Sequence, residues 1–471
     1  MSILLNKTPE YNRELRKWPV PKEAHKVKVE YGDKKYDFTI NPNTLDVYLG
    51  DFDFGEGEEY VEVMGPMLQM PRQRYLCLQP TLACNQACVY CFAQYYKDTG
   101  VKVMSFAEGK RAIDMFLPPS PKENDYFHIG FFGGEPLCAF PIIRKLVYYT
   151  AGKLSNQKRI QFHMTTNATL VTDEWIELFK EFKWTFIVSM DGPRELHNET
   201  RKMHDGGPTY DKVVEGLKKL AEVSSNITLR GTYVPKDNMH VLDRVRHLNQ
   251  FVKDGYANHV SVEPVQMSEQ QCLQTKDMPM PFNEEDTMKL QEEIYECAEW
   301  YVQEVLAGNK PVFHNFSKTL ERFVWKSPAW TECGAGRGYF TCASDGNVYA
   351  CHRLNATKIG TLKYGINEME RAKWLENRIY EREDCMSCPW RYFCGGGCRQ
   401  NSTFNMGNIH KPNPTECRLK GTFFRGCLYI MARLNEEGAY TRLYKIIMDP
   451  LRNSRVIKEK KSTCACNIQK K

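Results

Sequence analysis

Residues 74–92 read RYLCLQPTLACNQACVYCF, an apolar run followed at once by three closely spaced cysteines. The apolar, turn-bounded run 74–81 predicts a buried strand. Cys84, Cys88 and Cys91 then form a C-x3-C-x2-C pattern in the loop behind that strand. Three thiolates from one loop hold three irons of a 4Fe-4S cube and leave the fourth iron without a protein ligand. The pattern therefore predicts an iron-sulfur centre with one open position.

A zinc knuckle is the alternative interpretation of these cysteines. It requires a fourth cysteine or histidine nearby, and none follows Cys91 at a usable spacing. Zinc is therefore the weaker interpretation.

The strand before the cysteines is the first of six similar apolar runs, each followed by an amphipathic segment. The runs are 74–81, 127–134, 160–167, 184–192, 227–234 and 259–266. They recur about every forty residues, as expected of repeated βα units with a parallel sheet. We therefore expect an α/β fold, a partial (β/α)6 TIM-like barrel over residues 73–310. In such barrels the chemistry lies at the carboxyl ends of the strands.

Regions of different character flank the predicted barrel. Residues 27–50 alternate polar and apolar side chains around two turn sequences, which predicts a three-stranded meander within an N-terminal β module, residues 1–72. Residues 325–430 are irregular and rich in cysteine, so we expect bound metal to stabilise them. Residues 431–471 are expected to form a C-terminal helix and a basic tail, with helical sequence over 425–448.

The composition excludes several classes of protein. The chain has 471 residues and 18 cysteines, but no secretory signal and no apolar run long enough for a membrane helix. We therefore expect a cytoplasmic protein with reduced, metal-bound thiols and no membrane partner. The net charge is +6 and the basic excess is concentrated in the tail, so nucleic acid is not an expected partner.

Seven cysteines lie outside the metal-binding patterns. We expect those in apolar surroundings to be small buried side chains, namely Cys77, Cys138, Cys272, Cys297 and Cys427. Cys464 and Cys466 lie in the tail, where we expect a flexible end without a function. Thiol relay and adventitious metal binding are the alternatives for this pair.

The cysteine triad resembles that of the radical S-adenosylmethionine (SAM) enzymes, and further motifs follow in the family's order. Gly133-Gly134-Glu135-Pro136, after the second run, resembles the GGEP segment that bonds the amino group of SAM. Tyr90 occupies the aromatic position that packs near adenine. The resemblance also implies ribose and carboxylate contacts from Asn167, Ser189, Asp191 and Arg201. Turn and helix-cap roles are the alternative for Asn167 and Asp191.

This resemblance implies a defined reaction. The open iron chelates SAM, and one electron cleaves the sulfonium to methionine and a 5′-deoxyadenosyl radical, which abstracts a hydrogen atom from the substrate. The barrel positions the substrate and excludes water. A low-potential donor, flavodoxin or ferredoxin, is expected to supply the electron.

The second cysteine region resembles a SPASM domain, which binds two further 4Fe-4S clusters and would bring the total to three. By position, the resemblance implies a distal set of ligands, Cys385, Cys388, Cys394 and Cys417. It also implies a set nearer the barrel, Cys333, Cys351 and Cys398. A zinc ribbon is the alternative, but it accounts only for Cys385 and Cys388.

The near set lacks one ligand that many relatives supply from just upstream of Cys333, because residues 326–330 contain no cysteine. Cys342 replaces that ligand in one interpretation. In the other, the iron stays open and binds a cysteine thiolate of the substrate, which is later joined to a carbon radical. Both interpretations stay open at this point.

The resemblance favours a maturase that cross-links a ribosomally made precursor peptide (RiPP). We expect a thioether from cysteine to carbon, as in ranthipeptide and sactipeptide maturation. The N-terminal module fits a leader-binding role through strand addition, although it lacks the helices of the family's winged-helix-like recognition element.

Two other functions compete with this one. A sulfatase-type maturase makes formylglycine and carries an aspartate base directly after the position of Cys351. This chain has His352 there, and histidine can also act as a base. The third alternative is an iron-sulfur protein without radical turnover, which the GGEP segment and Asp191 disfavour.

Overall fold

The computed structural model describes residues 3–4, 16–21, 23–55, 58–63, 73–93, 102–117, 126–153, 159–236, 238–274, 279–326, 328–353, 357–375, 379 and 382–448. The basic tail with Cys464 and Cys466 lies outside the described residues. No described helix combines the length and apolar character needed to cross a membrane.

Six parallel strands form the barrel, as the sequence predicted. They are β7 (Gln73–Gln79), β8 (Tyr126–Phe131), β9 (Ile160–Thr166), β10 (Trp184–Ser189), β11 (Ile227–Tyr233) and β12 (His259–Pro264), paired in chain order. Side chains alternate along each strand. In β9, Phe162 and Met164 are buried, whereas the side chain of His163 between them is half-buried.

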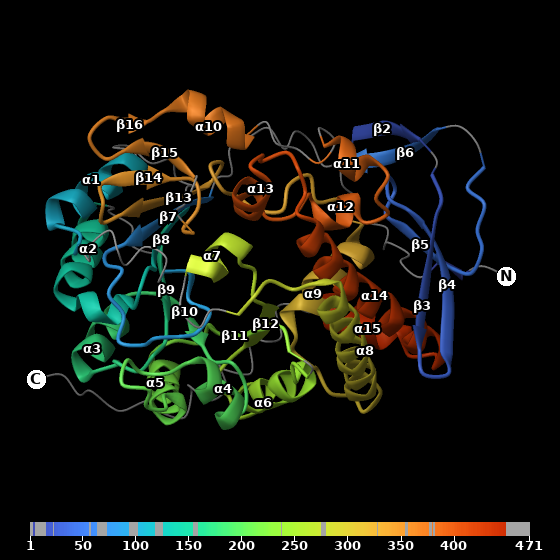
Figure 1. Cartoon of the computed structure of the whole chain (residues 1–471), viewed down its shortest axis with the longest axis horizontal. Helices are drawn as coiled ribbons and strands as arrows, with labels where there is room; N and C mark the ends of the chain where they lie inside the picture. The colour runs from blue at the N-terminus through green and yellow to red at the C-terminus, as the bar shows by residue number, and fades with distance from the viewer. Residues whose placement is uncertain are drawn as a thin grey trace, which may run out of the picture.

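Helices follow the strands and cover one face of the sheet (Figure 1). They are α1 (Phe106–Phe116), α2 (Phe140–Lys153), α3 (Asp173–Glu181), α4 (Arg194–Thr200), α5 (Tyr210–Val223) and α6 (Val241–Lys253), with a short 3-10 turn, η2 (Pro136–Ala139), before α2. The buried residues of these helices join the apolar strand residues in one core. The loops at the carboxyl ends of the strands are left free to carry polar groups.

The cysteine-rich region extends the barrel sheet, which the sequence did not predict. Strand β13 (Tyr339–Ala343) pairs in parallel with β7, the first barrel strand. The strands β14 (Asn347–Tyr349), β15 (Lys358–Thr361) and β16 (Gly365–Ile366) then continue the sheet in antiparallel fashion. Cys342 therefore lies inside the sheet, and Cys351 follows β14 closely.

Helices surround the rest of the cysteine-rich region. The long ones are α8 (Glu284–Leu306), α9 (His314–Trp325) and α14 (Pro414–Glu436), and the shorter ones are α7 (Glu269–Gln274), α10 (Glu368–Leu375), α11 (Glu383–Met386), α12 (Arg391–Cys394), α13 (Arg399–Met406) and α15 (Tyr440–Met448). The predicted helical stretch 425–448 is the second half of α14 together with α15. The expected domain boundary at residue 430 therefore falls inside α14, a helix that begins beside the cysteines and packs along α8 (Figure 1).

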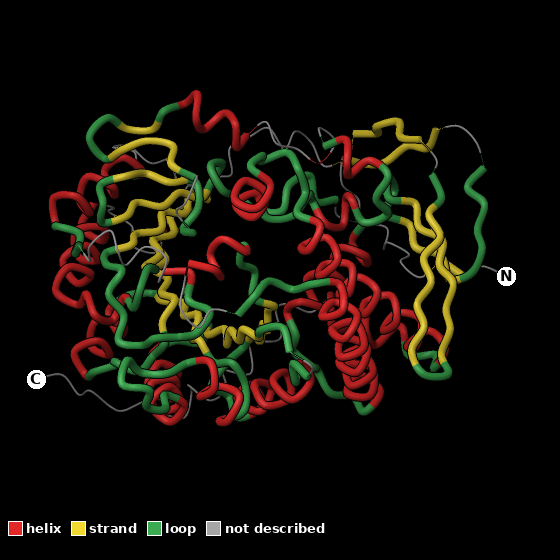
Figure 2. Tube along the Cα trace, in the orientation of Figure 1, coloured by secondary structure: helices red, strands yellow, loops and turns green. Residues whose placement is uncertain are grey.

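The N-terminal module contains the predicted meander, β3 (His25–Tyr31), β4 (Lys34–Asn41) and β5 (Asp46–Leu49), which β1 (Ile3–Leu4) extends at β5. A separate ribbon pairs β2 (Arg16–Pro21) with β6 (Glu58–Val63). Figure 2 shows these strands at the edge of the molecule, beside the cysteine-rich region. The buried Arg391 of α12 connects this module to the cysteine-rich region, because it donates hydrogen bonds to the side chains of Glu23 and Asn43.

Four of the five scattered cysteines are buried as expected, namely Cys77, Cys272, Cys297 and Cys427. The prediction was wrong for Cys138, which is exposed. Cys138 lies in η2, the short turn behind the GGEP segment, where the chain has just left the sheet.

Candidate functional site

The cysteine triad lies in the loop at the carboxyl end of β7. Two backbone hydrogen bonds hold this loop, from Ala87 N to Lys202 O at 2.8 Å and from Val89 N to Thr200 O at 3.0 Å. The pKa of the Cys84 thiol is raised to about 12, mainly by burial and to a lesser extent by the charges of Glu135, Cys88 and Cys91. The three thiols therefore lie close enough to influence one another.

The chemistry of this donor set fits an iron-sulfur cluster. Among the residues that the structure describes, no three histidine, cysteine or acidic side chains converge on a point that would hold a single metal ion. Each thiolate of a 4Fe-4S cube binds a different iron, so a cluster requires wider sulfur spacing than a single ion does. The triad supplies three such thiolates.

The GGEP segment packs against the triad loop. A Cβ atom added to Gly134 would lie 2.2 Å from Ala83 O, and one added to Gly133 would lie 2.4 Å from Thr81 O. Gly133 also has a φ of 138°, a conformation that residues with a side chain rarely adopt. Glycine is therefore required at both positions for the GGEP backbone to approach the cysteines.

The carboxylate of Glu135 is buried and bonded within the protein. It accepts hydrogen bonds from Thr166 Oγ1 at 2.7 Å, from Asn167 N at 2.7 Å and from Leu137 N at 3.0 Å. Burial raises the pKa of Glu135 to about 7. This side chain therefore ties the GGEP segment to the end of β9 and positions the backbone around it.

Asn167 stands at the edge of the triad loop. Its side-chain nitrogen donates to Asn85 Oδ1 at 2.9 Å and lies 3.9 Å from Cys84 Sγ, while its oxygen accepts from Thr169. The structure thus brings Asn167 close to Cys84 of the triad. Its contact with SAM stays a prediction.

Asp191 is the centre of a second buried network. Its carboxylate accepts hydrogen bonds from Tyr90 Oη at 2.5 Å, Thr200 Oγ1 at 2.7 Å, Arg201 Nε at 2.9 Å and Thr232 N at 2.9 Å. Burial opposes ionisation, but the Arg201 charge prevails and the pKa of Asp191 is lowered. Four donors thus occupy the carboxylate, which fastens the triad loop to the end of β10.

Arg201 links this network to the cluster site. Its Nη1 atom lies 3.9 Å from Cys88 Sγ, and its guanidinium lies 5.4 Å from the centre of the Tyr90 ring. Ser189 is half-buried at the end of β10, in register with Arg230 of β11. The SAM contacts of Ser189, Asp191 and Arg201 stay predictions.

Residues 351–353 link the cysteine-rich region to the residues that follow the barrel strands. His352 Nδ1 lies 2.8 Å from Tyr339 Oη, and the His352 ring packs 4.7 Å from the ring of Phe132, which directly follows β8. Burial lowers the pKa of His352 to about 3, so the imidazole is neutral near pH 7. Sequence reasoning singled out His352 only by its place after Cys351.

The cysteines of the near set come together. The pKa of the Cys351 thiol is raised to about 12, mainly by burial and to a lesser extent by the charges of Cys398 and Cys333. Cys342 is placed elsewhere. Burial raises its pKa as well, but the charges that add to the effect belong to Cys77 and Asp345. Cys342 therefore lies in the sheet with neighbours that do not belong to the near set.

The distal set also comes together, from α11, α12, the turn between them and α14. The pKa of the Cys417 thiol is raised to about 12, mainly by burial and to a lesser extent by the charges of Cys394, Glu416, Cys385 and Cys388. The structure thus brings the cysteines together in two groups, and their binding of clusters stays a prediction.

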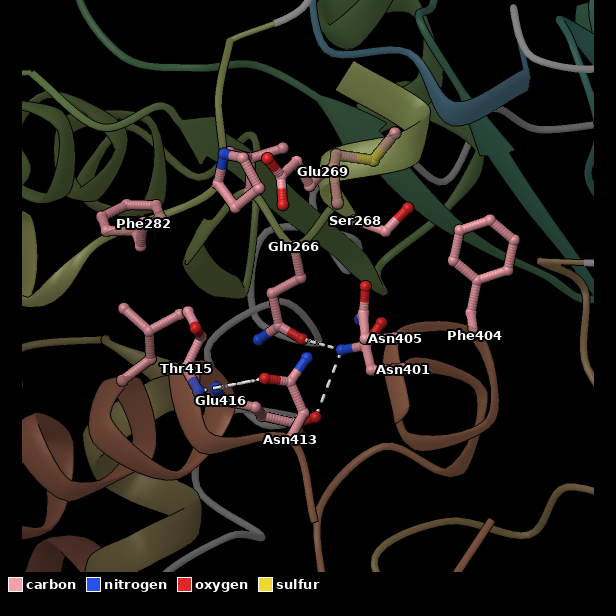
Figure 3. Close-up of a pocket in the computed structure, with 14 residues that line it drawn as sticks. Gln266, Ser268, Glu269, Phe282, Asn401, Phe404, Asn405, Asn413, Thr415 and Glu416 are labelled. Atoms are coloured by element: carbon pink, nitrogen blue, oxygen red, sulfur yellow. Dashed lines mark hydrogen bonds between the residues drawn. The ribbon is translucent and has the colours of Figure 1, made fainter. Parts of the chain in front are cut away.

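A cavity of about 370 Å³ lies between the segment after β12, α13 and the start of α14 (Figure 3). Its polar lining consists of the amides Gln266, Asn401, Asn405 and Asn413, the hydroxyl residues Ser268 and Thr415, and the acidic residues Glu269 and Glu416. Arg353 donates to Asn401 Oδ1 at 2.6 Å and to Gln266 O at 2.7 Å, which places the cavity directly beside residues 351–353. No motif marked these amides, although Gln266 ends the sixth predicted strand run.

Comparison with known proteins places the chain among characterised relatives. The model of the radical SAM superfamily matches residues 78–248. The cysteine-type anaerobic sulfatase-maturating enzyme of Clostridium perfringens (strain ATCC 13124) is 26% identical over 348 residues, which cover 70% of this chain and 90% of that enzyme.

Two solved structures share the fold. Native anSMEcpe with bound AdoMet and Kp18Cys peptide has a TM-score of 0.63 and 20% identity, covering 78% of this chain and 99% of that one. Streptococcus suis SuiB bound to the precursor peptide SuiA has a TM-score of 0.52 and 18% identity, covering 73% and 76%.

Proposed function

We propose that this chain, whose residues 78–248 match the radical SAM superfamily model, is an enzyme that modifies a ribosomally made precursor peptide and joins a cysteine sulfur of that peptide to a carbon atom. One solved structure of anSMEcpe and one of SuiB, each similar in fold to this chain, contain a bound peptide. This supports a peptide substrate here.

The residues that would hold the cofactors lie in the loops after the barrel strands. Cys84, Cys88 and Cys91 would hold the 4Fe-4S cluster, and the GGEP segment with the residues after β9 and β10 would hold SAM. When bound, this pair supplies a 5′-deoxyadenosyl radical that takes a hydrogen atom from the substrate. The chain's own part is to hold SAM still through the networks of Glu135 and Asp191. A flavodoxin or ferredoxin in the cytoplasm would donate the electron.

The position of Cys342 carries the thioether proposal. With Cys342 placed apart, the near set has three cysteines, Cys333, Cys351 and Cys398, and a cluster held by three thiolates keeps one iron open. A cysteine thiolate of the peptide is the ligand that such a position favours. Since Cys351 directly precedes His352, which packs against Phe132 after β8, the thiolate would be held close to the carboxyl ends of the barrel strands.

The amide-lined cavity supports entry of a peptide beside residues 351–353. Asparagine and glutamine side chains each offer a carbonyl acceptor and an NH₂ donor, which suits the unpaired amides of an extended backbone. Strand β3 is an edge of the N-terminal sheet and could receive a leader segment by strand addition.

A second candidate function is the oxidation of a cysteine or serine to formylglycine. The sulfatase-maturating relative favours it, and so does one observation at the site. His352 occupies the position where such maturases have an aspartate base, and its ring packs 4.7 Å from that of Phe132, directly after β8.

Mass spectrometry separates the two functions. The reconstituted enzyme is incubated anaerobically with SAM, a strong reductant and short cysteine-rich peptides encoded beside the gene. A thioether removes two hydrogens from the peptide and leaves one cysteine that does not react with iodoacetamide. Formylglycine gives an aldehyde that a hydrazide traps. An aldehyde product that has lost the cysteine sulfur, with no product that keeps the sulfur and lacks two hydrogens, would overturn the thioether proposal in favour of the second function.

A further inference from the structure

Lys420 lies between the two auxiliary cysteine sets. It follows Cys417 by three residues on α14, so both side chains lie on one face of that helix. Its Nζ atom lies 3.4 Å from Glu332 Oε1 and 3.6 Å from Glu416 Oε1. Lys420 therefore contacts two carboxylates that come from different parts of the chain.

Both carboxylates lead to the near set. Glu332 directly precedes Cys333 in the sequence. Glu416 is buried and its Oε1 atom accepts a hydrogen bond from the backbone nitrogen of Cys398 at 2.7 Å. The ammonium group of Lys420 is thus linked to two of the three near cysteines. Glu332 links it to Cys333, its neighbour in the sequence, and Glu416 links it to the backbone of Cys398.

The distal set meets the same lysine. Cys394 and Lys420 both line a cavity of about 500 Å³ between the inner barrel wall, α9 and α14. Arg322 also lines it and donates to the carbonyl of Phe393, the residue before Cys394, at 2.5 Å. The charged groups around Lys420 therefore contact the backbone that carries a distal cysteine.

The charges in this network do not cancel. Three cations, Lys318, Arg322 and Lys420, lie within 4 Å of the Glu332 carboxylate, and Glu416 is the second anion. Three positive charges against two negative charges leave one positive charge between the two sets. A cluster gains a negative charge when it is reduced, so a half-buried cation beside it favours the reduced form.

We propose that Lys420 raises the reduction potentials of both auxiliary clusters, and that Glu332 opposes it. This inference rests on the auxiliary clusters of the proposed function. Lys420 would then be a positioning residue that acts through charge, in contrast to a residue that only pairs with Glu332 to hold α14 in place. If Lys420 acts through charge, removal of its charge shifts the reduction potentials. If it only holds α14 in place, the potentials do not follow the sign of the charge.

The test is an EPR-monitored redox titration of the holoenzyme, in which the C84A/C88A/C91A variant serves to assign the auxiliary signals. For Lys420→Met we expect the ratio of reduced to oxidised cluster at a fixed potential to fall at least about tenfold for one auxiliary cluster and to fall for the other. A tenfold change corresponds to about 59 mV for a one-electron couple. Glu332→Gln should shift the ratio in the opposite direction.

Two controls isolate the charge. Lys420→Arg keeps the cation and should retain ratios close to those of the wild type. Lys180→Met removes an exposed lysine that pairs with Glu177, far from the cysteines in the sequence, and should change nothing. If Lys420→Met loses iron, the other two variants test the inference. Lys420→Arg should keep the wild-type ratio of reduced to oxidised cluster, and Glu332→Gln should raise it.

The outcomes that overturn the inference are distinct. Unchanged potentials in Lys420→Met with all its iron present would reject the role of Lys420, and so would a shift of the same sign in both Lys420→Met and Glu332→Gln. If the wild-type chain holds iron for one cluster only, the auxiliary clusters are absent. That result would contradict the proposed function from which this inference starts.

Discussion

The Tyr90 hydroxyl donates a 2.5 Å hydrogen bond to the Asp191 carboxylate, across 101 residues of sequence. Tyr90 belongs to the cysteine triad loop after the first barrel strand, and Asp191 follows the fourth strand. The same carboxylate pairs with Arg201, which in turn reaches Cys88. Contacts between the segments that follow the first and fourth barrel strands therefore hold the cluster site, in addition to the contacts within the triad loop.

Replacing Asp191 with asparagine should destabilise the protein. The change leaves the Arg201 guanidinium buried without its counter-charge, and breaking a buried pair in this way costs about 3–5 kcal/mol. Because the triad loop loses its attachment, we also expect less iron after anaerobic reconstitution. Chemical denaturation and iron analysis measure the two effects.

Asp211→Asn is the matched control for that variant. Asp211 pairs with Arg194 at an exposed position, where ion pairs contribute little to stability. Its stability and iron content should equal those of the wild type. Equal behaviour of the two variants would contradict the central role of Asp191.

Gly134→Ala should impair SAM binding. The added methyl group would overlap Ala83 O, so the GGEP backbone must move away from the triad loop. We expect the Kd for SAM to rise by about tenfold or more, a loss of about 1.4 kcal/mol, as measured by equilibrium dialysis of the reconstituted enzyme.

Gly152→Ala is the corresponding control. Gly152 lies in α2, and no atom lies within 4 Å of the position that an added Cβ atom would take, so this variant should bind SAM normally. Its helix should gain up to about 1 kcal/mol from the better helix former. Normal SAM binding in Gly134→Ala would show that the close backbone approach is dispensable.

Cys342→Ala and Cys351→Ala should differ in iron content. Cys342 lies among Cys77 and Asp345 in the sheet, whereas Cys351 lies among the near cysteines. We therefore expect Cys342→Ala to keep the iron content and spectra of the wild type and Cys351→Ala to lose one cluster. Loss of a cluster in Cys342→Ala would instead identify Cys342 as the fourth ligand.

Glu135 should make the stability of the protein depend on pH. Burial raises its pKa from 4.5 to about 7 in the folded state, so between these values the folded protein binds more protons than the unfolded chain. The corresponding stability is present below about pH 4.5 and is lost as the pH rises through about 7. Thermal unfolding of wild type and Glu135→Gln across this range tests it, since the glutamine variant should lack this part of the pH dependence. Equal pH dependence in both would contradict the assignment.

The barrel could be predicted well from the sequence, because its strands are buried on the helix-covered face and bounded by turns. All six runs became parallel strands in chain order. The cysteine triad could be recognised from its sequence because its spacing is local. The triad spans only residues 84–91.

Features that depend on long-range pairing were not predictable. Strand β13 joins β7 across more than 250 residues, and its short sequence carries no sign of its partner. For the same reason, the four bonds of Asp191 were missed, because Thr200 and Thr232 belong to no motif. The residues around Lys420 come from α9, α14 and the turn before Cys333, so only the folded chain brings these charges together.

The production of 5′-deoxyadenosine from SAM tests the central claim most directly. The anaerobically reconstituted wild type, given SAM and dithionite, should release 5′-deoxyadenosine and methionine, and the C84A/C88A/C91A variant should release neither. A wild-type protein that carries its iron and sulfide but forms no 5′-deoxyadenosine, or a triad variant that forms it equally well, would contradict the account.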